Sequence, residues 1–280
     1  MTPTKRPVFQ SHDSINEITK LLVERLKSEL GPKLVEVADA LGNAWQAPLG
    51  GDGLVSEVVL EGGFGFRKFD QPLAQLKFLA TEFLDALGRA HSDYRVDAST
   101  RLPYTHQVDA WKAVNRGQSA LVSAGTGSGK TECFLYPILS DLFSQRSAGW
   151  QEKGVQALFI YPTNALINSQ RDRLKAWLDC QLNPRENPIR FGLYNGALPE
   201  TPKLERKILT SDTCEVLSRT DLRASPPSIL ITNYSMLELA LVRPRDQPIF
   251  KNSNLKYVVL DEAHSYQGVM AAEIAMLLRR

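Results

Sequence analysis

The sequence predicts an α/β fold, in which a mostly parallel, doubly wound sheet carries helices on both of its faces. Four short apolar runs, at residues 157–161, 191–194, 229–231 and 257–260, alternate with helical patterns. Runs this short, apolar on both faces and separated by helices, are typical of buried parallel strands. Each run ends on polar or special residues, and a glycine-rich loop precedes the first run. Because such sheets bind ligands at the carboxyl ends of their strands, we expect these endings to form one functional edge.

Length and composition fit a globular chain with one large domain or two smaller ones. The chain has 280 residues, and 43% of them are hydrophobic, which suffices for a buried core. The N-terminus carries no apolar run long enough for a signal peptide or a membrane span, so we expect a cytoplasmic protein. A net charge of +2 is too weak to indicate nucleic-acid binding by itself. The three cysteines, Cys133, Cys180 and Cys214, lie far apart, so we expect reduced thiols and no structural metal site.

The first hundred residues predict a mainly helical extension without a catalytic motif. Ser14 and Glu17 form a capping box at the start of an amphipathic helix, which stops at a Gly-Pro pair at residues 31–32. The elements expected after it are a helix over 34–41, a strand over 54–60, and a helix over 72–87 with Leu73, Leu76, Phe83 and Leu87 facing inward.

The most specific motif is the glycine-rich loop within SALVSAGTGSGKT, at residues 119–131. A short apolar strand is expected at 120–122, and a helical pattern begins where Lys130 and Thr131 end the loop. Backbone N–H groups of such a loop and of the following helix cradle phosphate. The Lys130 amine can then reach the β and γ phosphates, and the Thr131 hydroxyl can bind Mg²⁺. The nucleotide-binding residues that this loop predicts are Ala124, Gly125, Thr126, Gly127, Ser128, Gly129, Lys130 and Thr131.

A pair of adjacent acids, Asp261 and Glu262, follows the last apolar run within the string DEAH. An aspartate at the tip of a strand can hold Mg²⁺, and the next carboxylate can deprotonate the water that attacks the γ-phosphate. An ordinary helix start would also explain this string. Its pairing with a phosphate loop upstream favours catalysis, with Lys130, Asp261 and Glu262 as catalytic residues and Thr131 and Asp261 as magnesium ligands.

The two motifs together resemble motifs I and II of the superfamily 2 DEAD/DEAH-box helicases. Motif I of that family commonly begins with Ala or Ser, which fits Ala124 in AGTGSGKT. The resemblance implies a RecA-like fold, ATP as the nucleotide, and His264 as a further catalytic residue. Gln107 matches the family's glutamine that reads the adenine edge, since an amide can both donate to and accept from adenine. Taken alone, Gln107 fits a surface glutamine that caps a helix equally well.

Two further loops resemble the family's motifs Ia and Ib, which contact the nucleic-acid backbone. PTNAL at residues 162–166, with Gln170, resembles motif Ia, and TNY at residues 232–234 resembles motif Ib. Such loops grip phosphates through N–H groups, threonines and helix N-termini, so no sequence preference is expected. The predicted contacts to DNA or RNA are Pro162, Thr163, Asn164, Gly196, Thr232 and Asn233. Two interpretations are equally supported for Arg171, Arg173 and Lys175: they contact phosphates, or they lie on a solvated helix face.

The match is closer still to one bacterial branch, the YprA-like helicases, which includes helicases of phage-defence systems such as Druantia. It covers about residues 100–280, so the expected domains are an extension at 1–100 and a first RecA-like domain at 101–280. The resemblance implies that motif III and a second RecA-like domain with an arginine finger are missing from this sequence. We therefore expect the isolated chain to be a weak ATPase and no helicase.

The leading hypothesis is the N-terminal part of an ATP-driven DNA or RNA helicase or translocase. The alternatives are a scaffold that holds ATP and nucleic acid without hydrolysis, and the motor of a restriction or nuclease complex. Retention of Glu262 favours an enzyme, because a scaffold needs no base. The family's sheet order also implies a strand between residues 120–122 and 258–260 that this sequence does not supply. We expect a gap there about two strand spacings wide, and a marginally stable, aggregation-prone chain.

Overall fold

In the computed structural model the chain divides into two compact units, Met1–Gly65 and Phe66–Arg280. The residues that the structure describes are 21, 24–25, 65–91, 93–125, 127–149, 154–179, 188–201, 214–251 and 253–279. Leu21, Glu24 and Arg25 are helical, as predicted for this part of the chain. The rest of that predicted helix, the predicted elements at 34–41 and 54–60, Thr126 and Cys180 lie outside the described residues.

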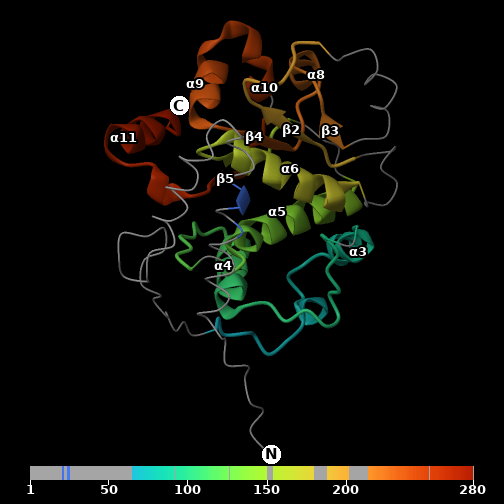
Figure 1. Ribbon diagram of the computed structural model, residues 1–280. Helices are drawn as coiled ribbons and strands as arrows, with labels where there is room; N and C mark the ends of the chain where they lie inside the picture. The colour runs from blue at the N-terminus through green and yellow to red at the C-terminus, as the bar shows by residue number, and fades with distance from the viewer. Residues whose placement is uncertain are drawn as a thin grey trace, which may run out of the picture. The chain divides into compact units, whose positions relative to one another are not determined.

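Five parallel strands form the sheet of the second unit, in the order β3-β2-β4-β1-β5 (Figure 1). The four predicted strands are confirmed as β1 (Ala157–Ile160), β2 (Phe191–Tyr194), β4 (Ile229–Thr232) and β5 (Tyr257–Leu260). β1 pairs in parallel with β4 on one side and with β5 on the other. β3 (Glu215–Val216) was not predicted, because two residues carry no periodic pattern.

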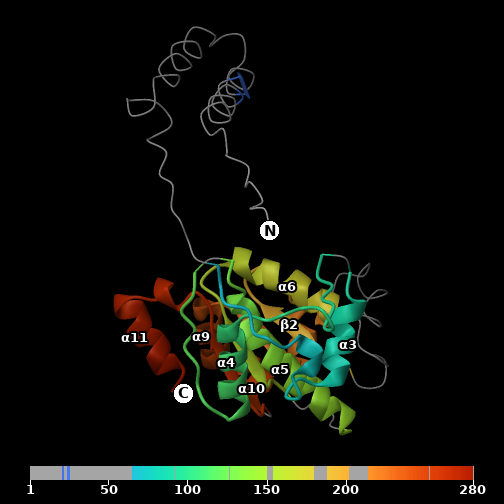
Figure 2. The same ribbon diagram turned by 90° about the horizontal axis from the view of Figure 1, so that it is seen from below.

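Helices cover both faces of this sheet, as the predicted fold class requires. One face packs against α5 (Lys130–Ser147) and α6 (Asn164–Leu178), with α4 (Thr105–Asn115) and α3 (Thr81–Arg89) packed on α5 (Figures 1 and 2). The other face packs against α8 (Arg219–Ala224), α9 (Tyr234–Val242), α10 (Pro248–Lys251) and α11 (Gly268–Leu277). Strand side chains alternate between the two cores: Phe159 joins the first and Leu158 the second.

The helix predicted over 72–87 is wrong as one element. The structure has a 3₁₀ turn, η2 (Leu73–Gln75), and then α3, with a turn at residues 77–78 and extended backbone at Leu76 and Ala80 between them. The Ala80 N–H donates to the Ser140 hydroxyl at 2.7 Å, so α5 holds the chain at the start of α3. The predicted inward residues are nevertheless all buried: Leu73, Leu76, Phe83 and Leu87. They share a core with α4 and α5, while a domain boundary at residue 100 stays a prediction.

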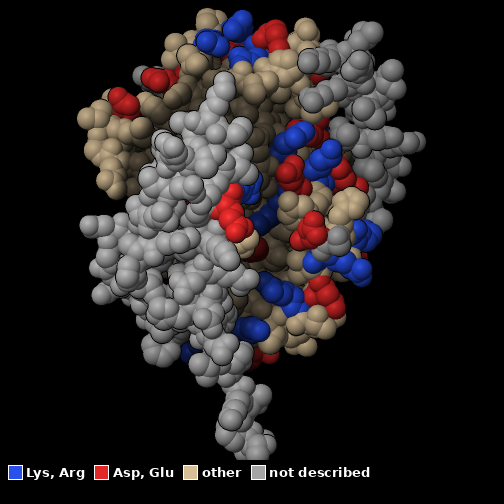
Figure 3. Space-filling model, in the orientation of Figure 1, with Lys and Arg blue, Asp and Glu red and all other residues tan. Residues whose placement is uncertain are grey.

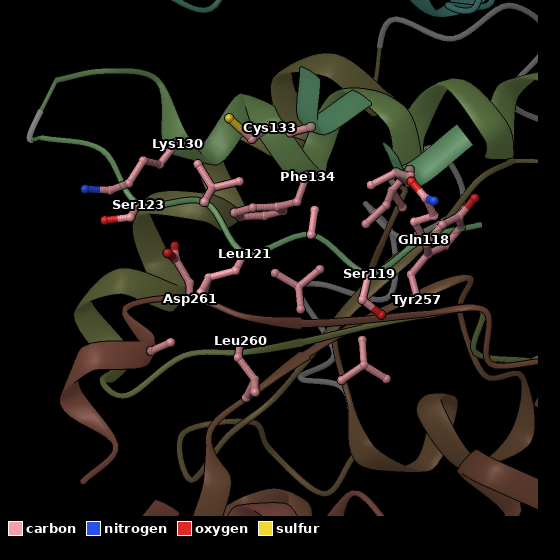
Figure 4. A pocket seen from close by; sticks show the side chains of 18 of the residues that line it. Gln118, Ser119, Leu121, Ser123, Lys130, Cys133, Phe134, Tyr257, Leu260 and Asp261 are labelled. Atoms are coloured by element: carbon pink, nitrogen blue, oxygen red, sulfur yellow. The ribbon is translucent and has the colours of Figure 1, made fainter. Parts of the chain in front are cut away.

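The strand predicted at 120–122 does not form. Residues 118–125 have no regular secondary structure, and Leu121 is 91% exposed. Among the described residues, no hydrogen bond from another backbone group reaches the backbone of 119–124. A cavity of about 630 Å³ separates this segment from β5 (Figure 4). A strand forms only when a neighbouring strand satisfies its N–H and C=O groups, and none of the described strands pairs with this segment. The expected gap in the sheet is therefore present.

The open edge also affects the burial of the last two elements, β5 and α11. β5 was expected to be buried on both faces, but Val258 and Leu260 are 45% and 37% exposed. In α11, Val269 is 76% exposed. The reason is that α11 buries only Ile274 and Leu277, so it leaves the outer face of β5 partly uncovered.

No helix within the described ranges is long and apolar enough to cross a membrane. Those same ranges contain no group of three or more His, Cys, Asp or Glu side chains placed to hold a metal ion. Cys133 and Cys214 are buried, and burial raises the pKa of the Cys133 thiol to about 12. A thiol with so high a pKa is unreactive at neutral pH.

Candidate nucleotide and nucleic-acid sites

The phosphate loop ends on a left-handed glycine, Gly129, which is also the N-cap of α5. Its φ is +72°, and a Cβ here would lie 2.4 Å from Gln107 Nε2 and 2.6 Å from Glu132 Oε2. The left-handed backbone angle therefore favours glycine at this position. α5 begins at the next residue, so its free N–H groups and positive dipole end face the loop.

Two polar side chains of the loop have the environment that a bound phosphate requires. The Lys130 amine donates to the Ala124 carbonyl oxygen at 2.9 Å and lies 3.5 Å from that of Gly125, so it spans the loop. Ser128 is 1% exposed, and its hydroxyl has no hydrogen-bond partner in the described part of the chain. A buried polar atom without a partner is costly, and a phosphate oxygen would satisfy it. The loop therefore fits a nucleotide phosphate.

Gln107 is buried, and both ends of its amide are used within the protein. Its Oε1 accepts from the Tyr104 backbone N–H at 2.8 Å, and its Nε2 donates to the Gly129 carbonyl at 3.0 Å. The neighbouring His106 ring also contacts the loop, with Nε2 3.0 Å from the Ser128 carbonyl oxygen. Gln107 thus joins the start of α4 to the phosphate loop, and its reading of adenine stays a prediction.

The DEAH residues follow β5 directly and line the same cavity as Lys130. Figure 4 shows the Asp261 carboxylate pointing toward the wall that carries Ser123 and Lys130. Burial raises the pKa of Asp261, and the charge of Glu262 adds to this, whereas the Glu262 N–H and Lys130 oppose it. A carboxylate that is costly to ionise is a favourable cation ligand, because a bound cation relieves that cost.

Glu262 adopts a left-handed backbone, with φ 50° and ψ 44°. Within the described ranges it is the sole non-glycine residue of this kind. Its carboxylate lies 3.2 Å from His264 Nδ1. Strained backbone at a carboxylate beside a phosphate loop is typical of functional sites.

The predicted nucleic-acid residues lie at the carboxyl ends of β1, β4 and β2, and hydrogen bonds connect the three loops. Asn233 Nδ2 donates to Asn164 Oδ1 at 3.2 Å, and the Thr232 hydroxyl donates to the Tyr194 carbonyl at 2.7 Å. Thr163, Asn164 and Gly196 are exposed, whereas Thr232 is fully buried. The Thr232 side chain is therefore placed to order the edge rather than to touch a ligand.

The two arginines on α6 for which phosphate contact was left open are engaged inside the fold. Arg171 forms a bidentate pair with Glu215, at 2.6 and 2.9 Å. Arg173 lies 3.5 Å from a Glu132 oxygen and stacks over the Trp177 ring at 5.9 Å. For Lys175 the choice stays open.

Charged side chains of both signs are interspersed on the face seen in Figure 3. The described part of this face therefore shows no single large basic patch.

The sequence analysis missed a group of residues that contact the end of β2 and the loop after it, chiefly Arg219, Arg223 and Asp246. These side chains carry no motif, and α8 is too short for a periodic pattern. An Arg-x-x-x-Arg spacing, which places two side chains on one helix face, was the one available signal.

Comparison with known proteins gives one family and several relatives. The family model described as DEAD/DEAH box helicase matches residues 104–280. Druantia protein DruE of Escherichia coli (strain UMEA 4076-1) is 29% identical over 64% of this chain and 15% of that protein. The uncharacterised ATP-dependent helicase YprA of Bacillus subtilis (strain 168) is 29% identical over 63% of this chain and 20% of that protein.

A solved structure of the DUF1998 helicase MrfA bound to DNA is similar in fold, with a TM-score of 0.53 and 25% identity. The match covers 76% of this chain and 23% of that one. A second MrfA structure, with DNA and AMPPNP, has the same TM-score. The chain thus spans about a quarter or less of the length of these relatives.

Proposed function

The chain belongs to the DEAD/DEAH box helicase family, and on that premise we propose that it is the ATP-binding part of a nucleic-acid-dependent motor. In this proposal it binds Mg-ATP and couples hydrolysis to movement along DNA or RNA, as the N-terminal part of a larger protein. The name of the relative YprA supports the use of ATP, and the solved relative MrfA is bound to DNA. The similarity to DruE supports a place in a Druantia-type system.

One observation carries the proposal: Lys130 and the DEAH residues line a single cavity, although the sequence separates them widely. The phosphate loop, the N-terminus of α5 and the Lys130 amine provide donors for the phosphates of ATP. The Thr131 hydroxyl and the Asp261 carboxylate would hold Mg²⁺. The ion would neutralise phosphate charge as it develops during transfer. Glu262 would accept the proton of the attacking water, and His264, 3.2 Å from its carboxylate, would orient it.

The test is nucleotide binding and turnover by two variants. In Lys130→Ala, we expect calorimetry to show a Mg-ATP affinity about 10- to 100-fold lower, because a charge-assisted contact of roughly 1.5–3 kcal/mol is lost. In Glu262→Gln, we expect Mg-ATP binding to be retained and single-turnover hydrolysis to be lost. Weak hydrolysis by the parent that Glu262→Gln loses would separate an enzyme from a non-hydrolysing scaffold.

Lys112→Ala is the matched control, because it removes an exposed lysine from α4, where the amine lies 5.3 Å from the Phe69 ring. It should leave the nucleotide affinity unchanged. Equal affinity of the parent and Lys130→Ala would refute the site. Equal hydrolysis by the parent and Glu262→Gln would refute Glu262 as the base.

A further inference from the structure

We propose that Arg219, on α8, is a positioning residue for nucleic acid, which fixes the loop after β2 so that the Gly196 N–H is available to a phosphate. The proposal rests on the proposed function, since it assigns a role at the predicted nucleic-acid edge. It concerns residues 195–200, called here the β2 loop.

Within the β2 loop, two backbone N–H groups donate to Asn195, and a third N–H group has no acceptor among the described residues. The Ala197 N–H donates to Asn195 Oδ1 at 3.1 Å, and the Leu198 N–H donates to the Asn195 carbonyl at 3.3 Å. Gly196 is exposed, and its N–H has no acceptor among the residues that the structure describes. An exposed backbone N–H at the carboxyl end of a parallel strand is a suitable donor to a phosphate oxygen.

Arg219 bonds the loop on both sides of Gly196. Its Nε donates to the Leu198 carbonyl and a terminal nitrogen donates to the Asn195 carbonyl, both at 3.1 Å. The guanidinium also lies 5.3 Å from the centre of the Tyr194 ring, at the end of β2. A planar guanidinium can hold two carbonyls in fixed relation, which a lysine amine on a flexible stem cannot do.

A buried carboxylate, Asp246, holds two side chains next to the β2 loop. Asp246 is fully buried, and it accepts from the Tyr194 hydroxyl at 2.7 Å and from Arg223 Nε at 2.8 Å. Arg223, one turn after Arg219 on α8, also pairs with Glu200 at the far end of the β2 loop. Asp246 lies in η3 (Pro244–Asp246), just after α9, so the β2 loop is tied to the chain segment that follows Asn233. Asp246 therefore anchors the β2 loop through Tyr194 and Arg223.

Arg219 could instead contact a phosphate itself. The salt dependence of nucleic-acid binding distinguishes these two roles. Each phosphate that a cation neutralises steepens the dependence of log K on log salt by about 0.7 for a single strand. A positioning arginine changes the affinity without changing this slope. Arg219→Lys keeps the charge and loses the fork, whereas Arg219→Gln loses both.

The experiment measures binding of a fluorescein-labelled single-stranded oligothymidine by anisotropy at several salt concentrations. We expect both variants to bind about 10-fold more weakly than the parent, with an unchanged salt slope and unchanged Mg-ATP affinity. Arg116→Lys, an exposed arginine after α4, is the control and should bind like the parent. Parental affinity in Arg219→Lys, or a slope shallower by about 0.7 in Arg219→Gln alone, would overturn the proposal.

Amide hydrogen exchange without nucleic acid separates this inference from the proposed function. We expect the β2 loop to exchange several-fold faster in Arg219→Lys, while β1 and β4 exchange as in the parent, which also shows that the variant folds. Unchanged exchange of the loop would overturn the positioning role. If the parent itself binds neither oligothymidine nor oligouridine at low salt, the proposed function fails, and the exchange result still decides whether Arg219 fixes the loop.

Discussion

Asp246 and Asp261 are aspartates of the same domain whose environments shift the pKa in opposite directions. At Asp246, burial opposes ionisation, but hydrogen bonds from Tyr194 and Arg223 outweigh it and lower the pKa. Its charge therefore stabilises the fold above pH 3.8, and this contribution is lost as the pH falls through the lowered pKa. At Asp261, burial dominates and raises the pKa. The first carboxylate is an anchor within the fold, and the second is a carboxylate whose ionisation its surroundings disfavour.

Replacing Asp261 with Asn should stabilise the isolated chain at neutral pH. The folded state of the parent binds the Asp261 proton more tightly than the unfolded state does, so ionisation costs stability as the pH rises from 3.8 through the raised pKa. Asparagine never ionises and avoids that cost. We expect thermal melts at pH 7 without Mg²⁺ to shift upward by roughly 1–3 °C, as a fraction of 1 kcal/mol would produce.

The shift should disappear near pH 3, where the carboxyl of the parent is also neutral. Mg-ATP affinity should fall in the same variant, because the proposed magnesium ligand is lost. A variant that melts lower than the parent at pH 7 would show that the Asp261 charge is compensated within the fold.

The contact between β2 and α8 depends on a glycine with an ordinary backbone. A Cβ at Gly192 would lie 2.5 Å from Leu222 Cδ2 and 3.3 Å from Pro227 Cγ. Leu222 is fully buried and cannot move into solvent to make room. The close approach of the helix to the strand therefore sets the position of α8, and with it the position of Arg219.

Gly192→Ala should lower the stability by about 1–3 kcal/mol, because it adds a methyl group to a filled core. Gly88→Ala in α3 is the matched control, since a Cβ there meets nothing within 4 Å. That change should stabilise by about 0.5–1 kcal/mol, because alanine loses less backbone freedom in a helix. Urea unfolding of both variants checks the pair, and a Gly192→Ala protein as stable as the parent would show that α8 shifts freely.

At the scale of the whole molecule, the dominant feature is an unfilled position in the sheet. β5 ends the sheet, residues 119–124 face it without pairing, and apolar side chains at Leu121, Val258 and Leu260 are exposed around the gap. Unpaired strand edges with apolar side chains invite pairing with other chains. The isolated chain should therefore self-associate through this gap.

Leu121→Lys should reduce that association without loss of folding stability, because Leu121 contributes little to the core at 91% exposure. Light scattering at rising protein concentration should show a delayed onset, while the melting temperature stays within about 1 °C of that of the parent, as for surface changes in general. Val242→Lys places the same charge on an exposed site of α9. An equal delay in that control would attribute the effect to net charge rather than to the gap.

Several features could be predicted because they are local. The four main strands follow from apolar runs of three to five residues, and the start of α5 follows from the glycines before Lys130. Partners distant in the chain could not be predicted. Nothing near Arg171 in the sequence indicates its pair with Glu215, and nothing near Ala80 indicates its bond to Ser140.

The sequence by itself determined the fold class, and it predicted the phosphate loop and the two carboxylates of the proposed site, because each depends on residue types at short spacing. The tertiary structure alone decided that residues 120–122 form no strand, since strand formation requires a neighbour that apolar character cannot supply. It also decided that Gln107 faces the Gly129 carbonyl and that Thr232 is buried. Those outcomes depend on which groups meet in space, and hydrogen-bond partners far apart in the chain leave no trace in local patterns.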